Sequence, residues 1–466
     1  MNILHISDLH YNEASARVSE KVIVKVADSI KTSGKKLDYV LFTGDLVFSA
    51  TIKSHFEAAR QQLFDYISKE LNVNPQNIIF CPGNHDIDRG SKHRAVRPYF
   101  KDEVTTLKEL NDFYSSKNEV YIDSLKTLTN YQEFVRNYHY TEEDSISDLY
   151  SIHYRSYQGN TLAFVCIYTS WLSAIWDDKG DLDEGNLCFP VNALQEIINT
   201  IGNKAKRKIL LMHHPISSLR KDISYEIEDL VYDNFEMLFT GHVHKMMNVA
   251  RHNGENGIYE HTAKASLTKG ASVGCSFIEN FDHEPNKYLV SEITYIKESD
   301  ECHFGTAVEV TIPVGEERAE QIRLLSKIHD HVGPEIKNAN SLLLQKDDED
   351  ENAFLTRFNT PYIKTQREDT ANTLPASIIS LNDLYAAEKK YIIYGKDKSG
   401  KSSLLRRIQL EFLMNYTIYQ RIPLYIDAKL EAVKIDDKYD LENVLRNYLG
   451  VNKRLNASIA QSDKLV

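Results

Sequence analysis

The chain has 466 residues, which is long for one domain and suggests two or three. Its 42% hydrophobic and 26% charged residues are ordinary for a folded protein, and its net charge of −12 excludes a bulk cation that binds nucleic acid without sequence preference, although not a local basic groove. No apolar run approaches the roughly 20 residues that a membrane span needs, so we expect no membrane partner.

The N-terminus and the cysteines indicate a location. The first residues have neither the basic start nor the long apolar stretch of a secretory signal, and the first candidate metal ligand is already Asp8. The five cysteines are scattered and odd in number, and no two have the short spacing of a metal-binding pair. We therefore expect a cytoplasmic protein with reduced cysteines.

Strands alternate with helices in the first 90 residues. Short apolar runs predict strands at 3–6, 39–42 and 78–80. Helices are expected between them, over about 18–30 and 56–67, because apolar residues there recur on one helical stripe. This alternation predicts an α/β fold with a largely parallel sheet.

Residues 90–157 interrupt the alternation. They are polar and rich in tyrosine and phenylalanine, and they predict a mostly helical insertion. Its aromatic side chains could stack on nucleic-acid bases, but aromatic residues at helical spacing more often form a core. Strands return at 162–167, 209–212 and 237–239 and continue within 257–313.

In five places, residues that can bind metal directly follow a predicted strand. They are Asp8 and His10, Asp45, Asn84 and His85, His213, and His242 and His244. Open α/β sheets gather ligands at the carboxyl ends of their strands, so we expect these side chains to converge. Alternate residues of extended backbone share one side, which suits the Asp-x-His and His-x-His pairs.

The mixture of ligand types narrows the choice of metal. Carboxylate, imidazole and amide oxygen suit Mn, Fe, Zn or Ni better than a thiolate-seeking ion. Two metals about 3.5–4 Å apart need a carboxylate between them, and Asp45 is the natural bridge. Any one of these histidines alone is more often a core or surface residue, but an ordered set of five motifs rarely arises by chance. The remaining histidines default to structural or surface roles: His139, His153, His252, His261, His283, His303, His329 and His331.

These motifs resemble those of the calcineurin-like metallophosphoesterase superfamily. Over residues 1–313, insertion excluded, the matching segments are Asp8-Leu9-His10, Gly44-Asp45, Gly83-Asn84-His85-Asp86, His213 and Gly241-His242-Val243-His244. The resemblance implies a four-layer α/β-β/α sandwich built on a pair of central sheets. It also implies two metal sites, one formed by Asp8, His10, Asp45 and His244 and the other by Asp45, Asn84, His213 and His242.

The same resemblance implies a mechanism. A hydroxide between the two metals would attack phosphorus in line, while the metals neutralise the phosphoryl oxygens. His85 resembles the histidine that contacts the phosphate and assists the leaving group, and Asp86 resembles the residue that orients this imidazole. His214 is a candidate for contact with substrate or with a ligand, rather than a metal ligand itself.

A phosphate-binding motif lies near the C-terminus. Residues 395–402 fit G-x-x-x-x-G-K-S, with a predicted strand at 391–394 before them and a predicted helix after them. The loop N–H groups would cradle phosphates, Lys401 would reach the β- and γ-phosphates, and Ser402 would ligate Mg²⁺. The predicted nucleotide-binding residues are Gly395, Gly400, Lys401, Ser402 and Ser403.

This C-terminal stretch, continued by a strand at 422–427, resembles the start of a STAND-type NTPase of the NACHT sort. The resemblance implies ATP with Mg²⁺ as ligand and homo-oligomerisation through this module. The predicted organisation is thus a metallophosphoesterase domain at 1–313, a helical and acidic linker at 314–374, and a partial P-loop α/β domain at 375–466. The acidic residue expected on a later strand is not reached, so we expect a fragment of a longer protein or a degenerate NTPase.

Two functional hypotheses follow. The first is a metal-dependent phosphoesterase that hydrolyses a phosphate mono- or diester, for which nucleic acid or a nucleotide is a reasonable substrate, joined to a nucleotide-binding switch as in bacterial anti-phage proteins. The alternative is an ATP-regulated signalling or scaffold protein whose metal domain mainly binds a partner. Basic residues just after the Gly-Asn-His-Asp motif either meet substrate phosphates or face solvent: Arg89, Lys92, His93 and Arg94.

Overall fold

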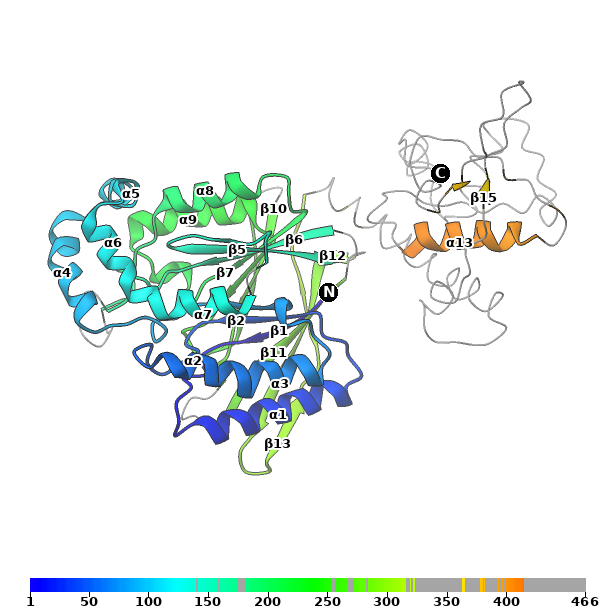
Figure 1. The fold of residues 1–466 in the computed structure, drawn as a ribbon, viewed down its shortest axis with the longest axis horizontal. Coiled ribbons are helices and arrows are strands. Elements are labelled where there is room, and N and C mark those ends of the chain that lie inside the picture. Colours follow the sequence, from blue (N-terminus) through cyan, green and yellow to red (C-terminus); the bar gives the residue numbers. More distant parts are fainter. Residues whose placement is uncertain are drawn as a thin grey trace, which may run out of the picture. The chain divides into compact units, whose positions relative to one another are not determined.

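A computed structural model describes residues 1–315, apart from 140, 158–159, 175–181, 254–255, 267–271 and 282–283, and beyond them chiefly residues 399–414 (Figure 1). The chain forms two compact units, Met1–Ile322 and Arg323–Val466. In the second unit β15 (Ile363–Lys364) pairs with β16 (Ile378–Ile379), and α13 spans Lys401–Met414. The predicted linker helix and most of the predicted NTPase domain lie outside the described residues.

The first unit contains two sheets. In spatial order, the strands of one are β13 (Glu301–Phe304), β12 (Glu284–Ile296), β11 (Ser272–Phe281), β1 (Asn2–Ile6), β2 (Tyr39–Thr43) and β3 (Ile78–Cys81), with β14 (Val308–Thr311) also paired to β12. Those of the other are β4 (Ser145–Ile146), β5 (Tyr150–Tyr157), β6 (Asn160–Ile167), β7 (Arg207–Leu211), β8 (Met237–Thr240), β10 (Asn256–Thr262) and β9 (Met247–Asn253). A mixed α/β fold with two sheets is therefore confirmed.

The two sheets differ in where they are parallel. In the second sheet the central strands β6, β7, β8 and β10 run parallel and both edges pair antiparallel. In the first sheet β1, β2 and β3 run parallel up to the β3 edge, and the pairs on the other side, from β1–β11 outward, are antiparallel. The prediction of a largely parallel sheet is thus wrong for both edges of the second sheet and for one side of the first. A parallel pair needs a long crossover, and after β8 the chain instead returns through turns that join neighbouring antiparallel strands.

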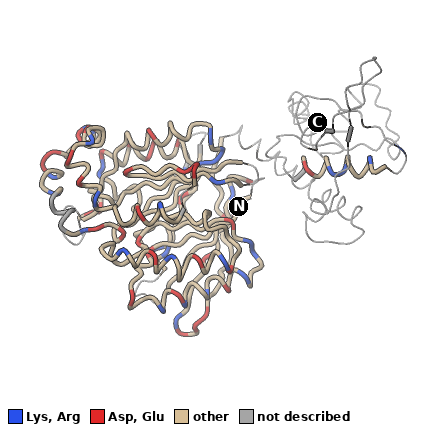
Figure 2. The backbone as a smooth tube through the Cα atoms, in the orientation of Figure 1, with Lys and Arg blue, Asp and Glu red and all other residues tan. Residues whose placement is uncertain are grey.

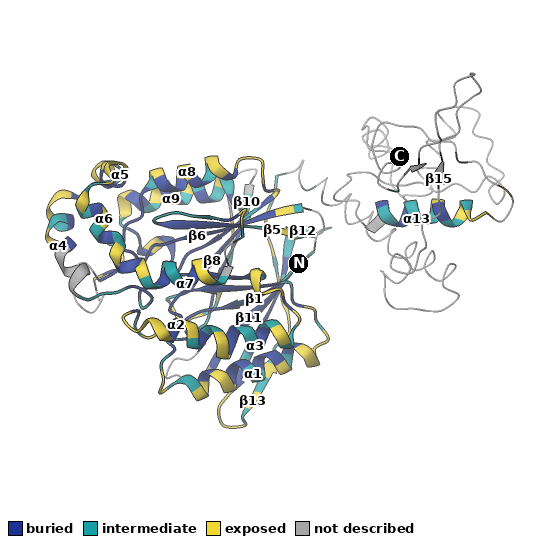
Figure 3. Cartoon of the chain, viewed as in Figure 1, coloured by how far each residue is buried: buried dark blue, intermediate teal, exposed yellow. Residues whose placement is uncertain are grey.

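Helices cover the outer face of each sheet (Figure 1). Beside the first sheet lie α1 (Ala16–Thr32), α2 (Lys53–Ala59), the π-helical segment η1 (Arg60–Phe64) and α3 (Asp65–Glu70), and beside the second lie α8 (Val191–Ile201) and α9 (Lys221–Asn234). Figure 3 shows buried strands between helices whose outer faces are exposed. The apolar stripe predicted over 18–30 explains this for α1, because Val22, Val26 and Ile30 are buried on one side.

The predicted insertion is helical in its first part. It forms α4 (Ser91–Glu103), α5 (Leu107–Ser116), α6 (Glu119–Leu125) and α7 (Thr129–His139). The prediction is wrong for its end, where β5 forms a hairpin with β6 and joins the second sheet. Phe100, Phe113 and Tyr131 of the insertion are buried, so these rings form core rather than a surface for stacking bases.

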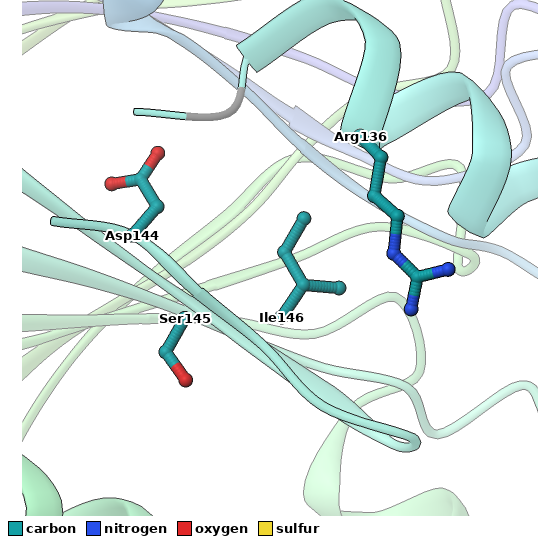
Figure 4. A pocket seen from close by; sticks show the side chains of 4 residues that line it. All are labelled: Arg136, Asp144, Ser145 and Ile146. Carbon is teal, nitrogen blue, oxygen red and sulfur yellow. The ribbon is translucent and has the colours of Figure 1, made fainter. Parts of the chain in front are cut away.

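A buried ion pair ties the residue before β4 to β5. Asp144 accepts hydrogen bonds from Arg155 (2.8 Å) and from His153 (3.2 Å). Burial acts to raise the pKa of Asp144, but these two hydrogen bonds outweigh it and hold the pKa below its ordinary value. A pocket of about 400 Å³ beside the pair is lined by Arg136, Asp144, Ser145 and Ile146, and Figure 4 shows Ile146 between Asp144 and Arg136. Its one acid already has partners, and none of the candidate metal ligands lines it.

The remaining short helices are η2 (Pro75–Asn77), η3 (Lys126–Leu128) and η4 (Ile216–Ser218). Within the part of the chain that the structure describes, no helix combines the length and the apolar character that crossing a membrane requires.

Candidate metal centre

The loops after five strands meet at one place in the first unit. Backbone hydrogen bonds join them, from Asp8 N to Gly44 O (3.0 Å), from His10 N to Asp45 O (2.8 Å) and from Gly241 N to His213 O (2.9 Å). The loop following β1 is therefore tied to the loop following β2, and the loop following β7 to the loop following β8. This convergence at the carboxyl ends of parallel strands is the arrangement that the sequence predicts.

The predicted ligand side chains come together in overlapping groups. Within each group the ligand atoms lie no more than 4.8 Å apart, and the groups are Asp8, His10 and His244; Asp8, Asp45 and His213; His10, Asp45 and His85; and His213, His214 and His242. Asp45 lies between the two sides of the cluster. Its Oδ2 atom is 3.8 Å from His10 Nε2 and 3.6 Å from His213 Nε2.

Asn84 supplies a test of whether a cation fits. His213 donates from Nδ1 to the carbonyl oxygen of Thr43 (2.6 Å), so its Nε2 atom carries a lone pair. Asn84 Oδ1 lies 3.1 Å from this nitrogen and 3.1 Å from Asp45 Oδ2, so it faces only acceptors. If the Asn84 amide were rotated by 180°, its NH2 group would donate hydrogen bonds to His213 Nε2 and to Asp45 Oδ2. With its oxygen facing these two atoms, Asn84 instead adds a third electron-pair donor, which is the arrangement that a bound cation requires. The donor set therefore fits a metal.

The electrostatics of the cluster also fit a cation. Burial raises the pKa of Asp45 to about 7, with the charge of Asp8 acting in the same direction and that of His85 against it. Burial lowers the pKa of His10 to about 4 and that of His242 to about 3. Neutral imidazoles are the form that binds metal, and two buried carboxylates repel each other until a cation lies between them.

The backbone at the cluster is left-handed at an unusual number of positions. Nine non-glycine residues of the described chain have positive φ, and five of them are candidate ligands, namely Asp8, His10, Asp45, His242 and His244. This conformation is unfavourable for residues with a Cβ atom and persists where surrounding contacts impose it, often at functional sites. The extended backbone expected for the Asp-x-His and His-x-His pairs is therefore wrong, because both members of each pair have positive φ.

Two glycines leave room for the carboxylates. A Cβ atom on Gly83 would lie 2.2 Å from Asp45 Oδ1, and one on Gly241 would lie 2.1 Å from Ser7 Oγ and 3.2 Å from Asp8 Oδ2. A side chain at Gly83 would displace Asp45, and one at Gly241 would displace Ser7 and crowd Asp8. Steric clashes therefore explain why the Gly-Asn-His-Asp and Gly-His-Val-His motifs each begin with glycine.

The expected role of Asp86 is wrong. Its carboxylate accepts hydrogen bonds from the backbone N–H groups of Gly83 (2.9 Å), Leu46 (3.1 Å) and Val47 (3.0 Å), and not from His85. The His85 imidazole instead hydrogen-bonds through Nδ1 to the carbonyl oxygen of Phe48 (2.8 Å). Asp86 thus holds the loop after β2 against the loop after β3, and a backbone carbonyl orients the histidine.

His85 and His214 both adjoin the cluster. The His85 ring lies 4.6 Å from the His10 ring, and its backbone N–H donates to Asp45 Oδ1 (2.8 Å). His214 is buried, is hydrogen-bonded through Nδ1 to Thr169 (3.0 Å), and leaves Nε2 without a partner among the described residues. His214 therefore stays a candidate for contact with a ligand.

The predicted basic residues are only partly described. The charge of Arg89 lowers the pKa of Asp45, so its guanidinium lies within electrostatic reach of the cluster. Lys92, His93 and Arg94 belong to α4, but their side chains fall outside the described part of the structure.

The predicted phosphate loop lies in the second unit. Gly395 and the preceding strand are outside the described residues. Gly400 has a φ of +84°, α13 begins directly after it at Lys401, and Ser402 and Ser403 lie in its first turn. Lys401 folds back onto its own loop and donates from Nζ to the carbonyl oxygen of Lys396 (2.8 Å).

Fold and ligand set together define a two-sheet α/β protein with a candidate dinuclear metal site. The sequence profile of the calcineurin-like phosphoesterases matches residues 1–246. The chain therefore belongs to this family of phosphoester hydrolases. It is 24% identical over 274 residues to the uncharacterized metallophosphoesterase-like protein YydB of Bacillus subtilis, a match that covers 56% of this chain and 52% of that protein. The chain thus spans about half the length of this relative.

Solved structures with a similar fold are distant. Purple acid phosphatase PPD1 from yellow lupin is 11% identical with a TM-score of 0.39, and the match covers 69% of this chain and 55% of that one. The calcineurin-like phosphoesterase YfkN from Bacillus subtilis is 11% identical with a TM-score of 0.26, and the match covers 70% of this chain and 96% of that one. At this distance the likeness carries no information about substrate.

Proposed function

We propose that this chain hydrolyses phosphate mono- or diesters at a dinuclear centre of divalent Mn, Fe, Zn or Ni held by Asp8, His10, Asp45, Asn84, His213, His242 and His244. The observation that supports this most directly is the position of Asp45, whose Oδ2 atom faces both His10 and His213. Metals bound in this way supply Lewis-acid activation of water and neutralise charge on phosphoryl oxygens.

The protein's own contribution is to hold these groups in place. The Thr43 carbonyl fixes the ring of His213 so that Nε2 faces the cluster, and the backbone N–H of His242 and the ring of His244 both hold Asp8. The His85 Nδ1–H donates to the Phe48 carbonyl oxygen, so Nε2 is the ring atom left to meet substrate. As an imidazolium, His85 would give its Nε2 proton to the departing oxygen and become a neutral imidazole.

Nucleic acid or a nucleotide is the substrate that we propose. The charge of Arg89 acts to lower the pKa of Asp45, which supports the proposal that Arg89 meets a phosphate at the cluster. Figure 2 shows Lys and Arg interspersed with Asp and Glu along α1 and α3, so these helices offer no basic track for a long duplex. Recognition is therefore proposed to be local, at the ester itself.

Metal removal tests the proposed activity. The full chain is stripped with a chelator, reconstituted with each of the four metals, and assayed with bis-p-nitrophenyl phosphate. We expect turnover only after reconstitution, because both carboxylates of the cluster need a cation. If no metal restores turnover although metal binds, the alternative of a scaffold that binds a partner is favoured.

A second candidate function is nucleotide binding at the loop before α13. The start of α13 right after Gly400, and the return of Lys401 to its own loop, support a phosphate-binding turn at a helix N-terminus. By analogy of architecture, we propose that ATP with Mg²⁺ at this loop controls homo-oligomerisation in anti-phage defence.

Replacing Lys401 by Ala tests this second function. A fluorescent ATP analogue with Mg²⁺ is expected to bind the full chain at least about tenfold more tightly than the Lys401→Ala variant, because the ammonium reaches the terminal phosphates. Lys396→Ala, which leaves the carbonyl partner of Lys401 in place, is the matched control. Equal affinity of all three chains would contradict nucleotide binding at this loop.

A further inference from the structure

Phe48 is an exposed aromatic residue next to the metal cluster. It is 56% exposed, whereas aromatic rings of the insertion such as Phe100 and Tyr131 are buried. In the described chain only one other large aromatic residue is comparably exposed, Tyr225 on the outer helix α9. A single exposed apolar side chain is ordinary on a protein surface, so the position of Phe48 beside the candidate active site, and not its exposure alone, points to a ligand.

The backbone holds Phe48 in a fixed place. Its N–H donates to the carbonyl oxygen of Tyr11 (2.9 Å), and its own carbonyl oxygen accepts from His85 Nδ1 (2.8 Å). The two preceding residues donate their backbone N–H groups to the buried carboxylate of Asp86. Phe48 therefore belongs to a loop whose backbone is hydrogen-bonded on both sides. These bonds fix the point from which the Phe48 ring extends.

The ring stands beside the proposed proton donor. Its centroid is 5.6 Å from that of the His85 ring, with an angle of 42° between the two planes. The His85 ring in turn lies 4.6 Å from that of His10, a candidate metal ligand. A substrate whose departing oxygen meets His85 would thus extend its leaving group past Phe48.

We propose that Phe48 stacks on a nucleobase of the substrate and that the esters hydrolysed here are those of nucleotides, an inference that rests on the proposed phosphoesterase activity. A flat ring gains most from a flat partner, because base–aromatic stacking adds to the burial of apolar area and tolerates any base. An alkyl or sugar group gains much less from the same ring. The chemistry is shared by a single-stranded nucleic acid and by a mononucleotide.

Two matched pairs of substrates test this inference by turnover. One pair is oligodeoxythymidylate and an abasic oligomer of the same length, and the other is thymidine 5′-phosphate and deoxyribose 5-phosphate. For whichever pair the metal-loaded full chain hydrolyses, kcat/KM is expected to be about tenfold or more higher for the member with a base. Phe48→Tyr should keep this ratio, and Phe48→Leu should bring it close to unity. Tyr225→Leu is the control for loss of an exposed aromatic residue and should leave the ratio as in the unaltered chain.

Binding without turnover separates this inference from the proposed activity. In a His85→Asn background, where an N–H donor for the Phe48 carbonyl is kept, an oligothymidylate carrying one 2-aminopurine is titrated with metal-loaded chain. Stacking is expected to quench its fluorescence, and Phe48→Leu is expected to weaken binding about tenfold and to remove the quenching. If quenching is seen but the unaltered chain hydrolyses none of the substrates, the proposed phosphoesterase activity would be overturned and the proposed stacking site would stand.

Three results would overturn the inference itself. These are equal rates for both members of a hydrolysed pair, a preference for the base that survives Phe48→Leu, and, although bis-p-nitrophenyl phosphate is hydrolysed, absence of quenching both of the 2-aminopurine oligomer and of 2-aminopurine deoxyriboside 5′-phosphate titrated in the same way. The last result would point to a leaving group without a base. The substrate pair that shows the preference identifies the kind of substrate. A nucleic-acid substrate shows the preference in the oligomer pair, and a mononucleotide substrate shows it in the monoester pair.

Discussion

Replacing Asp45 by Asn is expected to lower kcat/KM for bis-p-nitrophenyl phosphate by at least about a thousandfold and to reduce the bound metal by about half. Asp45 is 2% exposed, and its Oδ2 atom faces His10 on one side and His213 on the other. An amide has one oxygen and no charge, so it can serve at most one of the two proposed ions. The loss therefore affects metal content and rate together.

The fold should tolerate this change. Burial already raises the pKa of Asp45 to about 7, which means that the site disfavours its charge when no cation is present. A neutral amide of the same shape removes that cost, so we expect the metal-free variant to unfold at no lower temperature than the metal-free parent. A loss of activity with an unchanged melting temperature would separate a defect of the site from a defect of folding.

Metal content by mass spectrometry, melting temperature and initial rates are the measurements. Asp229→Asn makes the same chemical change at an exposed position of α9 and is expected to leave all three unchanged. A variant of Asp45 that binds as much metal as the parent and stays within tenfold of its rate would show that this carboxylate is not shared between two ions.

The parts of the candidate site that depend on the order of strands and loops along the chain could be predicted from the sequence. The ends of β1, β2, β3, β7 and β8 were predicted from short apolar runs, and the polar residues after them do converge. This works because a strand run and its following loop are local features, and the parallel arrangement brings their ends together. The position of Asp45 between the two histidines follows from that arrangement.

The features that the sequence did not predict depend on distant pairing. Strand β5 was placed in a helical insertion because the whole segment is polar and rich in aromatic residues, although Tyr150, Ile152 and Tyr154 alternate with polar residues as in a strand. The family resemblance implied that Asp86 orients the His85 imidazole. In the structure the Asp86 carboxylate instead accepts hydrogen bonds from three backbone N–H groups. Backbone donors leave no mark in a sequence, so neither this nor the Phe48 carbonyl that orients His85 could be predicted.

Replacing His85 by Asn is expected to lower kcat/KM by about 10²–10⁴ for an ester with a poor leaving alcohol, while the metal content stays as in the parent. Asn can still donate an N–H to the Phe48 carbonyl, which His85 now does through Nδ1, but it has no proton to give at the position of Nε2. His303→Ala, which removes an exposed histidine of β13, is the matched control.

The leaving group distinguishes proton donation from a purely structural role of His85. A p-nitrophenolate departs without protonation, so His85→Asn should cost far less on bis-p-nitrophenyl phosphate than on a thymidine dinucleotide. A residue that only shaped the cluster would instead lower both rates by the same factor, because both esters meet the same metals. Equal losses on the two substrates would therefore assign His85 to positioning, and a loss confined to the poor leaving group would assign it to proton transfer.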